Sequence, residues 1–256
     1  MTAIISDPPY GNDNMKGDLN AYLQEHRNDE LPSIRNDDQN SMREVIDAVL
    51  VAGKRFLAEP CAVALCCSGG GGPNGPQFAW LANRLDEHGL QFFHQVIWDK
   101  RNPGIGWRYR RQFEQIMIGH RRGGRIAWAD PSLAHSNIIS YMPRKNRIHP
   151  NEKPIDLLGK LLDLHTKPGE LVLDPFMGSG TTGVAAARWG RKFVGVEIEE
   201  HYFEMSCKRI EEAYKQPQLF AEKPAKEEQI GLEMEYVETG RRNLNHRRRR
   251  ESASHR

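Results

Sequence analysis

The sequence predicts an α/β protein with an open, mostly parallel sheet and helices on both faces. Over 256 residues, short apolar runs typical of strands alternate with amphipathic helical runs. Near residues 171–189, a strand, a glycine-rich loop and a helix follow one another, as in the ligand-binding units of such sheets. No apolar run reaches the roughly 18 residues that a membrane span needs. We expect one domain over residues 1–215, followed by a disordered basic tail over residues 216–256.

The first half of the chain supplies five expected strands and two helices. The apolar strand Ala3–Ser6 precedes a polar stretch, Gly11–Ser41, which we expect to be a long mobile loop. Apolar residues then recur at helical spacing from Val45 to Leu57. The other elements expected here are the strand Ala62–Cys67, the helix Phe78–Glu87, the strand Leu90–Trp98, and a hairpin of Phe113–Ile118 with Ile126–Trp128.

The second half continues the alternation after the segment Leu133–Asn151, which shows no clear periodicity. Pro154 opens a helix that extends to about His165, because proline is favoured in a first helical turn. The remaining expected elements are the strand Leu171–Asp174, the helix Thr181–Trp189 with Gly190 as its C-cap, the strand Phe193–Glu197 and the helix Glu200–Tyr214.

The net charge of +2 conceals two strongly basic blocks. Residues 101–147 carry ten Arg or Lys against two acidic residues, and residues 241–256 carry seven Arg against one Glu. The two blocks therefore carry +8 and +6, and the rest of the chain carries −12. Basic blocks on an acidic body indicate a surface that binds a polyanion. A solvated basic loop or tail is the alternative.

The four cysteines (Cys61, Cys66, Cys67 and Cys207) lack the spacing of metal ligands, as do the ten histidines. The first residues show no basic-then-apolar leader. We therefore expect no metal, reduced thiols partly buried in a strand, and a cytoplasmic location.

The first candidate site begins at Asp174, where the sequence LVLDPFMGSGTT forms strand, loop and helix. Gly178 and Gly180 let the backbone turn tightly and approach a ligand closely. The helix start behind them offers N–H groups to an anionic group such as a carboxylate. Glu197, 23 residues after Asp174, ends the next strand, where an acid can hold ribose hydroxyls. A nucleoside that carries a carboxylate fits this loop better than a pyrophosphate.

The second candidate site is Asp7-Pro8-Pro9-Tyr10, directly after the first strand. The prolines lack N–H donors and fix the backbone, so their carbonyls stay available as acceptors. Asp7 and the Pro8 carbonyl can each accept one hydrogen of an –NH₂ group, which aims the nitrogen lone pair at an electrophile. Tyr10 offers an aromatic face to a base taken out of its stack. A proline-rich turn is the plain alternative.

The two candidate sites form one site if the first strand lies beside the strand that ends at Asp174. Ligands of open α/β sheets bind at the carboxyl ends of strands, and both motifs follow such ends. An amino group on Asp7 would then face a methyl donor on the glycine loop. A sulfonium donor supplies its own leaving group, so the transfer needs neither a strong base nor a metal.

These residues resemble the amino-methyltransferases of DNA, in which an Asp-Pro-Pro-Tyr motif accompanies a Phe-x-Gly-x-Gly cofactor loop. The resemblance spans about residues 3–212. The catalytic motif precedes the loop, an order similar to that of the circularly permuted beta group. The resemblance implies a Rossmann-like methyltransferase fold, circularly permuted, with a small basic target-recognition insertion at about residues 120–148. It also implies S-adenosylmethionine as cofactor and a flipped-out base of double-stranded DNA as acceptor.

The resemblance also implies roles for single residues. Asp7, Pro8, Pro9 and Tyr10 would be catalytic. The cofactor would be held by Asp174, Phe176, Gly178, Ser179, Gly180, Thr181 and Glu197, together with Lys153 from the segment that precedes the cofactor loop. The DNA would be contacted by Arg108, Arg110, Arg111, Arg121, Arg122, Arg125, Arg144 and Lys145. The motif favours adenine N6 within this family, and cytosine N4 is the alternative.

The sequence departs from the family at its start. Members usually have a further strand with a Gly-Asp pair before the catalytic strand, and the acid contacts the cofactor adenine. Here the motif begins at residue 7, so the chain start is truncated, another segment substitutes, or cofactor binding is weak. The alternative of another class is a DNA-binding module that has lost catalysis.

The tail and the family resemblance indicate further candidate partners. Gln216–Phe220 resembles the short peptide with which bacterial proteins dock on the replication sliding clamp. A cognate restriction nuclease is another candidate partner. The resemblance implies the cytoplasm of a bacterial or phage-infected cell.

Overall fold

The computed structural model describes residues 1–11, 39–68, 71–72, 75–103, 110–132, 135–143 and 152–215. The chain divides into two units, Met1–Ala221 and Glu222–Arg256, and every described residue belongs to the first. Outside the described residues lie most of the predicted loop 11–41, parts of the predicted insertion 120–148 and the predicted tail 216–256. Arg108, Arg144 and Lys145 lie there too.

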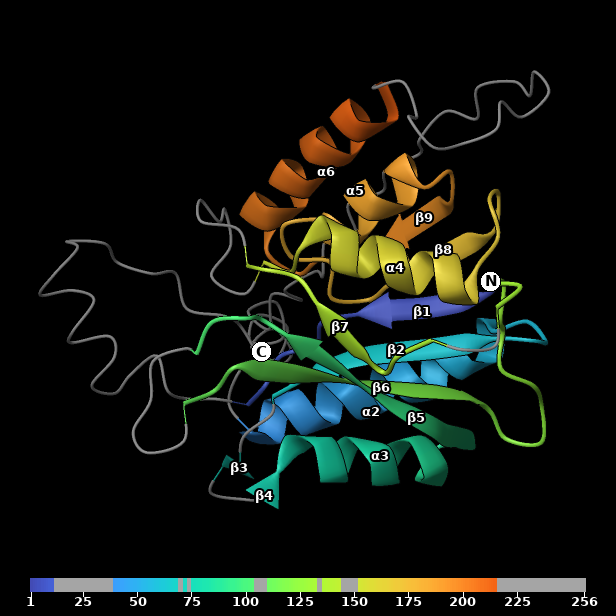
Figure 1. Cartoon of the computed structure of the whole chain (residues 1–256), viewed down its shortest axis with the longest axis vertical. Helices are drawn as coiled ribbons and strands as arrows, with labels where there is room; N and C mark the ends of the chain where they lie inside the picture. Colours follow the sequence, from blue (N-terminus) through green and yellow to red (C-terminus); the bar gives the residue numbers. More distant parts are fainter. Residues whose placement is uncertain are drawn as a thin grey trace, which may run out of the picture. The chain divides into compact units, whose positions relative to one another are not determined.

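A seven-stranded sheet forms the centre of the first unit (Figure 1). Its strands are β1 (Ala3–Ser6), β2 (Ala62–Cys67), β5 (Leu90–Asp99), β6 (Phe113–Arg121), β7 (Ile138–Ser140), β8 (Leu171–Asp174) and β9 (Lys192–Gly195), in the order β7-β5-β6-β2-β1-β8-β9. β6 is antiparallel to both neighbours, and all other pairings are parallel. The prediction of an open, mostly parallel sheet is confirmed. Gly71–Gly72 (β3) and Gly75–Pro76 (β4) form a separate two-stranded ladder.

β1 lies in the interior of the sheet, between β2 and β8. All four of its side chains are buried, as expected for a strand that is covered on both faces. Its parallel register with β8 puts Ala3 opposite Val172 and Ile4 opposite Leu173. The condition that joins the two candidate sites, adjacency of the first strand and the strand that ends at Asp174, is therefore confirmed.

Helices cover both faces of the sheet (Figure 1). The helices are α2 (Gln39–Phe56), α3 (Gln77–Glu87), α4 (Ile155–His165), α5 (Thr181–Arg188) and α6 (Glu200–Lys215). Alternate side chains of β1 and β2 point to opposite faces. Ala3 and Ile5 pack in one core cluster with α4 and α5, whereas Ile4 packs in another with α2 and α3. α6 packs on α5.

The predicted hairpin of Phe113–Ile118 with Ile126–Trp128 is wrong. β6 is nine residues long and pairs with β5 and β2, and Ile126 forms only an isolated bridge with Cys61. The chain reverses after β6 through Gly123, whose φ of 75° suits glycine. Beyond it, the Ala127 amide bonds to the Cys61 carbonyl, so this segment runs past the sheet rather than back along β6.

β7 was not predicted, because a strand of three residues is too short to show a period. It pairs in parallel with β5, with Ile138 opposite Ile97. Of the cysteines expected in a strand, Cys66 and Cys67 are buried in β2 and Cys61 is buried just before it, whereas Cys207 is partly buried in α6.

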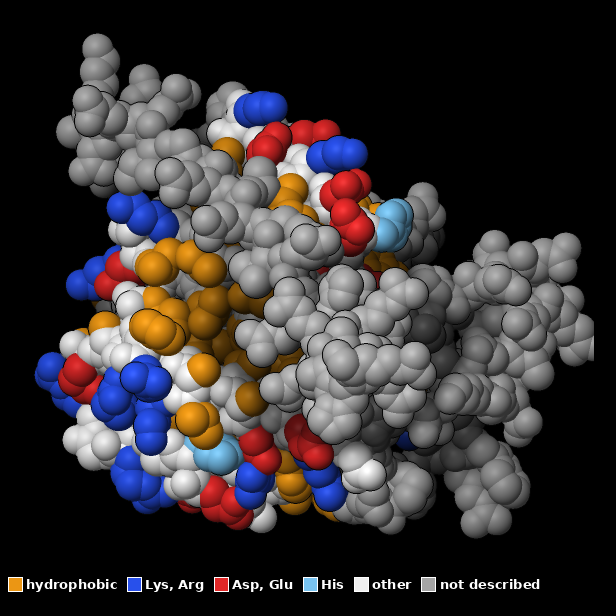
Figure 2. All heavy atoms as spheres, turned by 180° about the vertical axis from the view of Figure 1, so that it is seen from behind, with side chains coloured by type: hydrophobic (Ala, Val, Ile, Leu, Met, Phe, Trp, Pro, Cys, Tyr) orange, Lys and Arg blue, Asp and Glu red, His pale blue; other side chains and the backbone are white. Residues whose placement is uncertain are grey.

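β9 forms one edge of the sheet, and no described strand pairs with its outer side. Val194 of β9 and the residues Val196 and Ile198 that follow it are 47%, 53% and 54% exposed. Figure 2 shows hydrophobic side chains gathered on the back of the molecule, next to Lys and Arg side chains. Within the described segments, no helix is both long and apolar enough for a membrane crossing.

Candidate functional site

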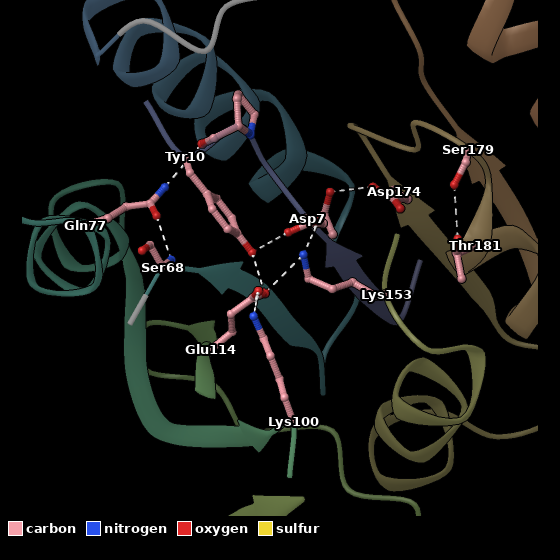
Figure 3. Close-up of polar contacts among 12 residues, drawn as sticks. Asp7, Tyr10, Ser68, Gln77, Lys100, Glu114, Lys153, Asp174, Ser179 and Thr181 are labelled. Carbon is pink, nitrogen blue, oxygen red and sulfur yellow. Dashed lines mark hydrogen bonds and ion pairs between the residues drawn. The ribbon is translucent and has the colours of Figure 1, made fainter. Parts of the chain in front are cut away.

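Four segments of the chain meet beside the carboxyl end of β1 (Figure 3). Asp7 and Tyr10 follow β1, Lys100 follows β5, Glu114 is the second residue of β6, and Lys153 precedes α4. β6 is antiparallel to β2 and β5. Its amino end therefore lies at the end of the sheet where the parallel strands have their carboxyl ends. The fold thus gathers two carboxylates, two ammonium groups and a phenol at one place.

The contacts within this cluster are short and mutual. Lys153 Nζ lies 2.6 Å from Asp7 Oδ2 and 3.2 Å from Glu114 Oε2. The Tyr10 hydroxyl is 2.8 Å from Asp7 Oδ1 and 3.0 Å from Glu114 Oε2. Its single proton can serve only one of the two carboxylates at a time. Lys100 Nζ lies 2.5 Å from Glu114 Oε1.

The electrostatics of the cluster keep Glu114 and Lys153 charged. Burial alone would raise the pKa of Glu114, but Lys153 and Lys100 outweigh it and hold that pKa at about 2. Burial alone would lower the pKa of Lys153, but Asp7 and Glu114 hold it well above its usual value. Burial raises the pKa of Asp7, and Lys153 offsets part of that rise. At neutral pH, one ammonium group therefore lies between two carboxyl groups.

Gln77 fixes the acceptor motif from the opposite side. Its side-chain amide donates to the Pro9 carbonyl over 3.2 Å and accepts from the Ser68 amide over 2.8 Å. Gln77 is the first residue of α3 and is 8% exposed. Sequence reasoning missed Gln77, Glu114 and Lys100 as site residues, because each is a single polar residue that no motif marks.

The glycine loop after β8 has the tight turn that the sequence predicts. Gly178 and Gly180 have φ angles of 50° and 77°, where other residues are strained. A Cβ on Gly178 would meet nothing within 4 Å, so this glycine faces open space. A Cβ on Gly180 would lie 2.7 Å from Ser206 Cβ, so Gly180 is needed for close packing on α6. Only Gly178 therefore fits the predicted close approach to a ligand.

Glu197 lies directly against this loop. Its carboxylate accepts from the Gly178 amide over 2.8 Å and from the Glu199 amide over 2.9 Å. Carboxylate oxygens can accept further hydrogen bonds, so donors such as hydroxyls can still be bound there. Ser179 and Thr181 have their hydroxyl oxygens 3.3 Å apart at the start of α5.

Asp174 links the two motifs. Its Oδ1 accepts from the Phe176 amide over 3.1 Å and from the Ser6 hydroxyl, and Ser6 is the last residue of β1. Burial outweighs these hydrogen bonds and raises the pKa of Asp174 to about 6. The side chain that ends β8 is therefore joined to the residue just before Asp7.

A second link runs through the dipeptide before α4. Arg209 donates to the Ser179 carbonyl over 2.5 Å and to Glu152 Oε1 over 2.7 Å. The next residue, Lys153, contacts Asp7 instead of the glycine loop. The structure therefore puts Lys153, predicted to bind the cofactor, in the cluster around Asp7, while Glu152 is tied to the loop.

The arginines predicted to contact DNA lie at two separate places. Arg110 and Arg111 are exposed and immediately precede β6, at the edge that carries Asp7. Arg121 is the last residue of β6. The eight residues of strand that lead to it put it roughly 25 Å from the end of the sheet that carries Asp7. Arg122 and Arg125 follow it at that far end and are exposed.

The Arg121 side chain is already engaged in the fold. Its Nη2 donates to the carbonyls of Lys54 and Leu57 over 2.8 and 2.6 Å, at the end of α2.

Among the described residues, no group of three or more His, Cys, Asp or Glu side chains is arranged to hold a metal ion.

Comparisons with known proteins find similarity to DNA methyltransferases. Residues 127–208 match a family model described as DNA methylase. The type II methyltransferase M2.DpnII of Streptococcus pneumoniae is 29% identical over 144 residues, which are 50% of this chain and 54% of that protein. The chain thus spans about half the length of the curated relatives that it matches.

Solved structures extend the likeness to the fold of most of the chain. M1.HpyAVI in complex with S-adenosylmethionine is 25% identical, with a TM-score of 0.59, over 82% of this chain and 88% of that one. The cytosine-N4-specific PvuII DNA methyltransferase is 18% identical, with a TM-score of 0.61, over 84% of both chains. The chain therefore has a fold found in DNA methyltransferases, and its residues 127–208 match a family model described as DNA methylase.

Proposed function

We propose that this chain transfers the methyl group of S-adenosylmethionine to the exocyclic amino group of a base in double-stranded DNA. The observation that carries the proposal is the parallel pairing of β1 with β8, which sets Asp7 beside the glycine loop. The Ser6–Asp174 hydrogen bond fastens the two strand ends together. The matching family model is described as DNA methylase, and the similar PvuII enzyme is named a DNA methyltransferase, which supports DNA as the substrate.

The residues of the loop fit this cofactor. Gly178 faces open space, and α5 begins directly after Gly180. The first backbone N–H groups of α5 therefore suit the carboxylate of the methionine part. Glu197, at the turn of the loop, suits the ribose hydroxyls. When bound, S-adenosylmethionine supplies an electrophilic methyl group on a sulfur that leaves as a neutral thioether.

Asp7 and the Pro8 carbonyl orient the amino nitrogen by accepting its two hydrogens. The nitrogen then forms a bond to the methyl carbon while the sulfur–carbon bond breaks. Positive charge develops on the nitrogen, and the Asp7 carboxylate stabilises it before one proton is lost to solvent. Tyr10 provides an aromatic face for the base. Gln77 holds the motif through the Pro9 carbonyl, so that the acceptors stay in place.

We propose adenine N6 as the acceptor, with the base flipped out of the duplex into this site. The order of the motifs, with Asp7 before the cofactor loop, supports the circularly permuted beta arrangement. Cytosine N4 is the second candidate, because the fold is shared with the cytosine-N4-specific PvuII enzyme.

Arg110 and Arg111 are the described arginines best placed to contact DNA near the site. A cognate restriction nuclease is a further proposed partner, because the matching relative is a type II enzyme.

The proposal is tested by offering tritiated S-adenosylmethionine with unmethylated DNA, with RNA and with protein in parallel. We expect label in DNA alone, and N6-methyladenine after digestion to nucleosides. Label in N4-methylcytosine would select the second candidate, and label confined to RNA or protein would refute the DNA substrate. A degenerate DNA-binding module would bind DNA but show no heat of binding with S-adenosylmethionine by calorimetry.

A further inference from the structure

Lys153 stands where the incoming amino group has to bind. Its Nζ is 2.6 Å from Asp7 Oδ2, and its side chain is only 5% exposed. An amino group that donates to Asp7 needs the same carboxylate within about 3 Å. The other oxygen of Asp7 is contacted by the Tyr10 hydroxyl. The carboxylate is therefore engaged on both oxygens before a base arrives.

The charge of Lys153 also matters for the transfer itself. Methyl transfer makes the amino nitrogen positive, and an ammonium group on the same carboxylate would repel it strongly in a site shielded from water. The carboxylate of Asp7 stabilises the positive charge on the nitrogen fully only if another group balances the positive charge of Lys153. Glu114 is in place for this, since its Oε2 is 3.2 Å from Lys153 Nζ.

Glu114 is itself held firmly for that task. It is the second residue of β6, an interior strand of the sheet, and its side chain is 17% exposed. Lys100 fixes one of its oxygens over 2.5 Å, and the Tyr10 hydroxyl reaches the other over 3.0 Å. Lys100 in turn lies over the Trp98 ring, with its Nζ 5.2 Å from the ring centroid.

We infer that Glu114 is a positioning residue: when the amino group of the base binds Asp7, Glu114 becomes the ion-pair partner of Lys153. The negative charge of Asp7 then stabilises the nitrogen that receives the methyl group. The inference rests on the proposed function and adds Glu114 and Lys153 to it. Neither residue exchanges a proton with the base. Their effect is on the charge and the position of Asp7.

The charged and titratable groups that face Asp7 come from several elements. They are Tyr10 of its own motif, Cys66 and Cys67 at the end of β2, Glu114 of β6, Lys153 before α4 and Asp174 at the end of β8. Burial keeps the pKa of the Cys66 thiol well above its usual value, so it stays neutral in the working range. The pKa of Asp174, about 6, sets a separate titration in the acid range.

The kinetic test uses four full-length proteins: the wild type, Glu114→Gln, Lys153→Gln and the double variant. Single-turnover transfer of tritiated methyl to unmethylated DNA is measured at pH 8, with cofactor affinity from calorimetry. Glu114→Gln should slow transfer about tenfold at unchanged cofactor affinity, because it removes one of the two carboxylates described at Lys153. Removal of Lys153 as well should restore most of the rate.

The double variant is decisive, because a structural role of Glu114 predicts further loss and not rescue. A double variant as slow as Glu114→Gln, or a Glu114→Gln protein as fast as the wild type, would overturn the inference. Glu212→Gln on α6 and Lys167→Gln in the turn before β8, both exposed and outside the site, are the matched controls and should match the wild type.

A second arm does not depend on transfer. In protein labelled with ¹³C at the Asp carboxyls, NMR follows the titration of Asp7 without DNA, and Asp7→Asn assigns its signal. Lys153→Gln should raise the midpoint of Asp7, and Glu114→Gln should lower it, because they remove charges of opposite sign. Shifts in the same direction, or none, would overturn the charge partnership. A wild type that transfers no methyl to DNA would refute the proposed function, and this titration would still decide the partnership.

Discussion

At the scale of single residues, the site depends on acids that differ in environment. Glu114 stays ionised because two ammonium groups face it, whereas burial, with a smaller contribution from the charge of Asp7, outweighs the hydroxyl and amide donors at Asp174 and raises its pKa to about 6. Both carboxyl groups lie within the same part of the sheet. Their partners, and not burial alone, therefore decide which one is charged at neutral pH.

Gly178 offers a direct test of the cofactor loop. Gly178→Val places a branched side chain in the open space at the turn, so we expect affinity for S-adenosylmethionine to fall below detection by calorimetry. The matched control is Gly169→Val, which has the same kind of backbone strain at φ 82° and also faces open space, but lies in the turn before β8. Cofactor affinity that is equal in the two variants would speak against the assignment of the loop.

Asp174 predicts a dependence of stability on pH. Its folded-state pKa, about 6, lies above its unfolded value of 3.8, so the folded protein binds the proton more tightly. The stabilisation by this proton is complete below about pH 4 and is lost as the pH rises through about 6. Asp174→Asn imitates the protonated form and should raise the free energy of unfolding by up to about 3 kcal/mol at pH 7.5.

Urea denaturation at pH 7.5 and pH 4 checks this prediction. The gain from Asp174→Asn should vanish at pH 4, where the wild-type carboxyl is already protonated. Asp86→Asn, at a side chain that is 52% exposed, is the control and should give no comparable difference between the two pH values. An equal effect of Asp174→Asn at both pH values would contradict the raised pKa.

At the scale of elements, β6 separates residues that the sequence groups together. The basic block at residues 101–147 looks like one surface in the sequence. A nine-residue strand instead separates Arg110 and Arg111, which precede it, from Arg121 at its far end. Charge clustering along a chain could not reveal this, because it does not say whether the intervening residues are extended.

Arg121 and Arg111 should therefore respond differently to substitution. Arg121→Gln removes the donor from two carbonyls at the end of α2 and should lower the free energy of unfolding by about 1–3 kcal/mol. Arg111→Gln should leave stability unchanged and reduce the slope of log DNA affinity against log salt concentration by about one. Urea denaturation and DNA titrations at several salt concentrations compare them. The reverse pattern would refute both assignments.

The sequence predicts the bounds of β1, β2 and β8 correctly, because each is an apolar run that ends at a turn-forming segment. Asp7-Pro8, Ser68 before the glycines, and Asp174-Pro175 mark these ends. The sequence does not predict the two pairing partners of β6. It favours a local hairpin, whereas the strand pairs with β5 and β2. Pairing between distant segments leaves no local signal.

At the scale of the whole molecule, the site exists because four distant segments meet at one edge of the sheet. The two motifs, Asp7–Tyr10 and the loop after Asp174, were predictable because their residue types and spacing carry chemistry by themselves. Glu114, Lys100 and Gln77 were not, because each acquires its role only through tertiary contact. Motifs therefore indicate the reaction, and the fold supplies the residues that tune it.

The edge strand β9 adds a property of the whole sheet. Val194 of β9, with Val196 and Ile198 directly after it, leaves apolar side chains exposed at this edge of the sheet. Val196 and Ile198 flank Glu197, the acid proposed to hold the ribose.

The central claim is that Asp7 and the loop after Asp174 form one site for methyl transfer. Single-turnover transfer from tritiated S-adenosylmethionine to unmethylated DNA, measured for the wild type and Asp7→Ala together with cofactor affinity, tests it most directly. We expect Asp7→Ala to bind the cofactor about as well as the wild type. Its rate of methyl transfer should be lower by on the order of 10²-fold or more. An Asp7→Ala protein that methylates DNA at nearly the wild-type rate would contradict it.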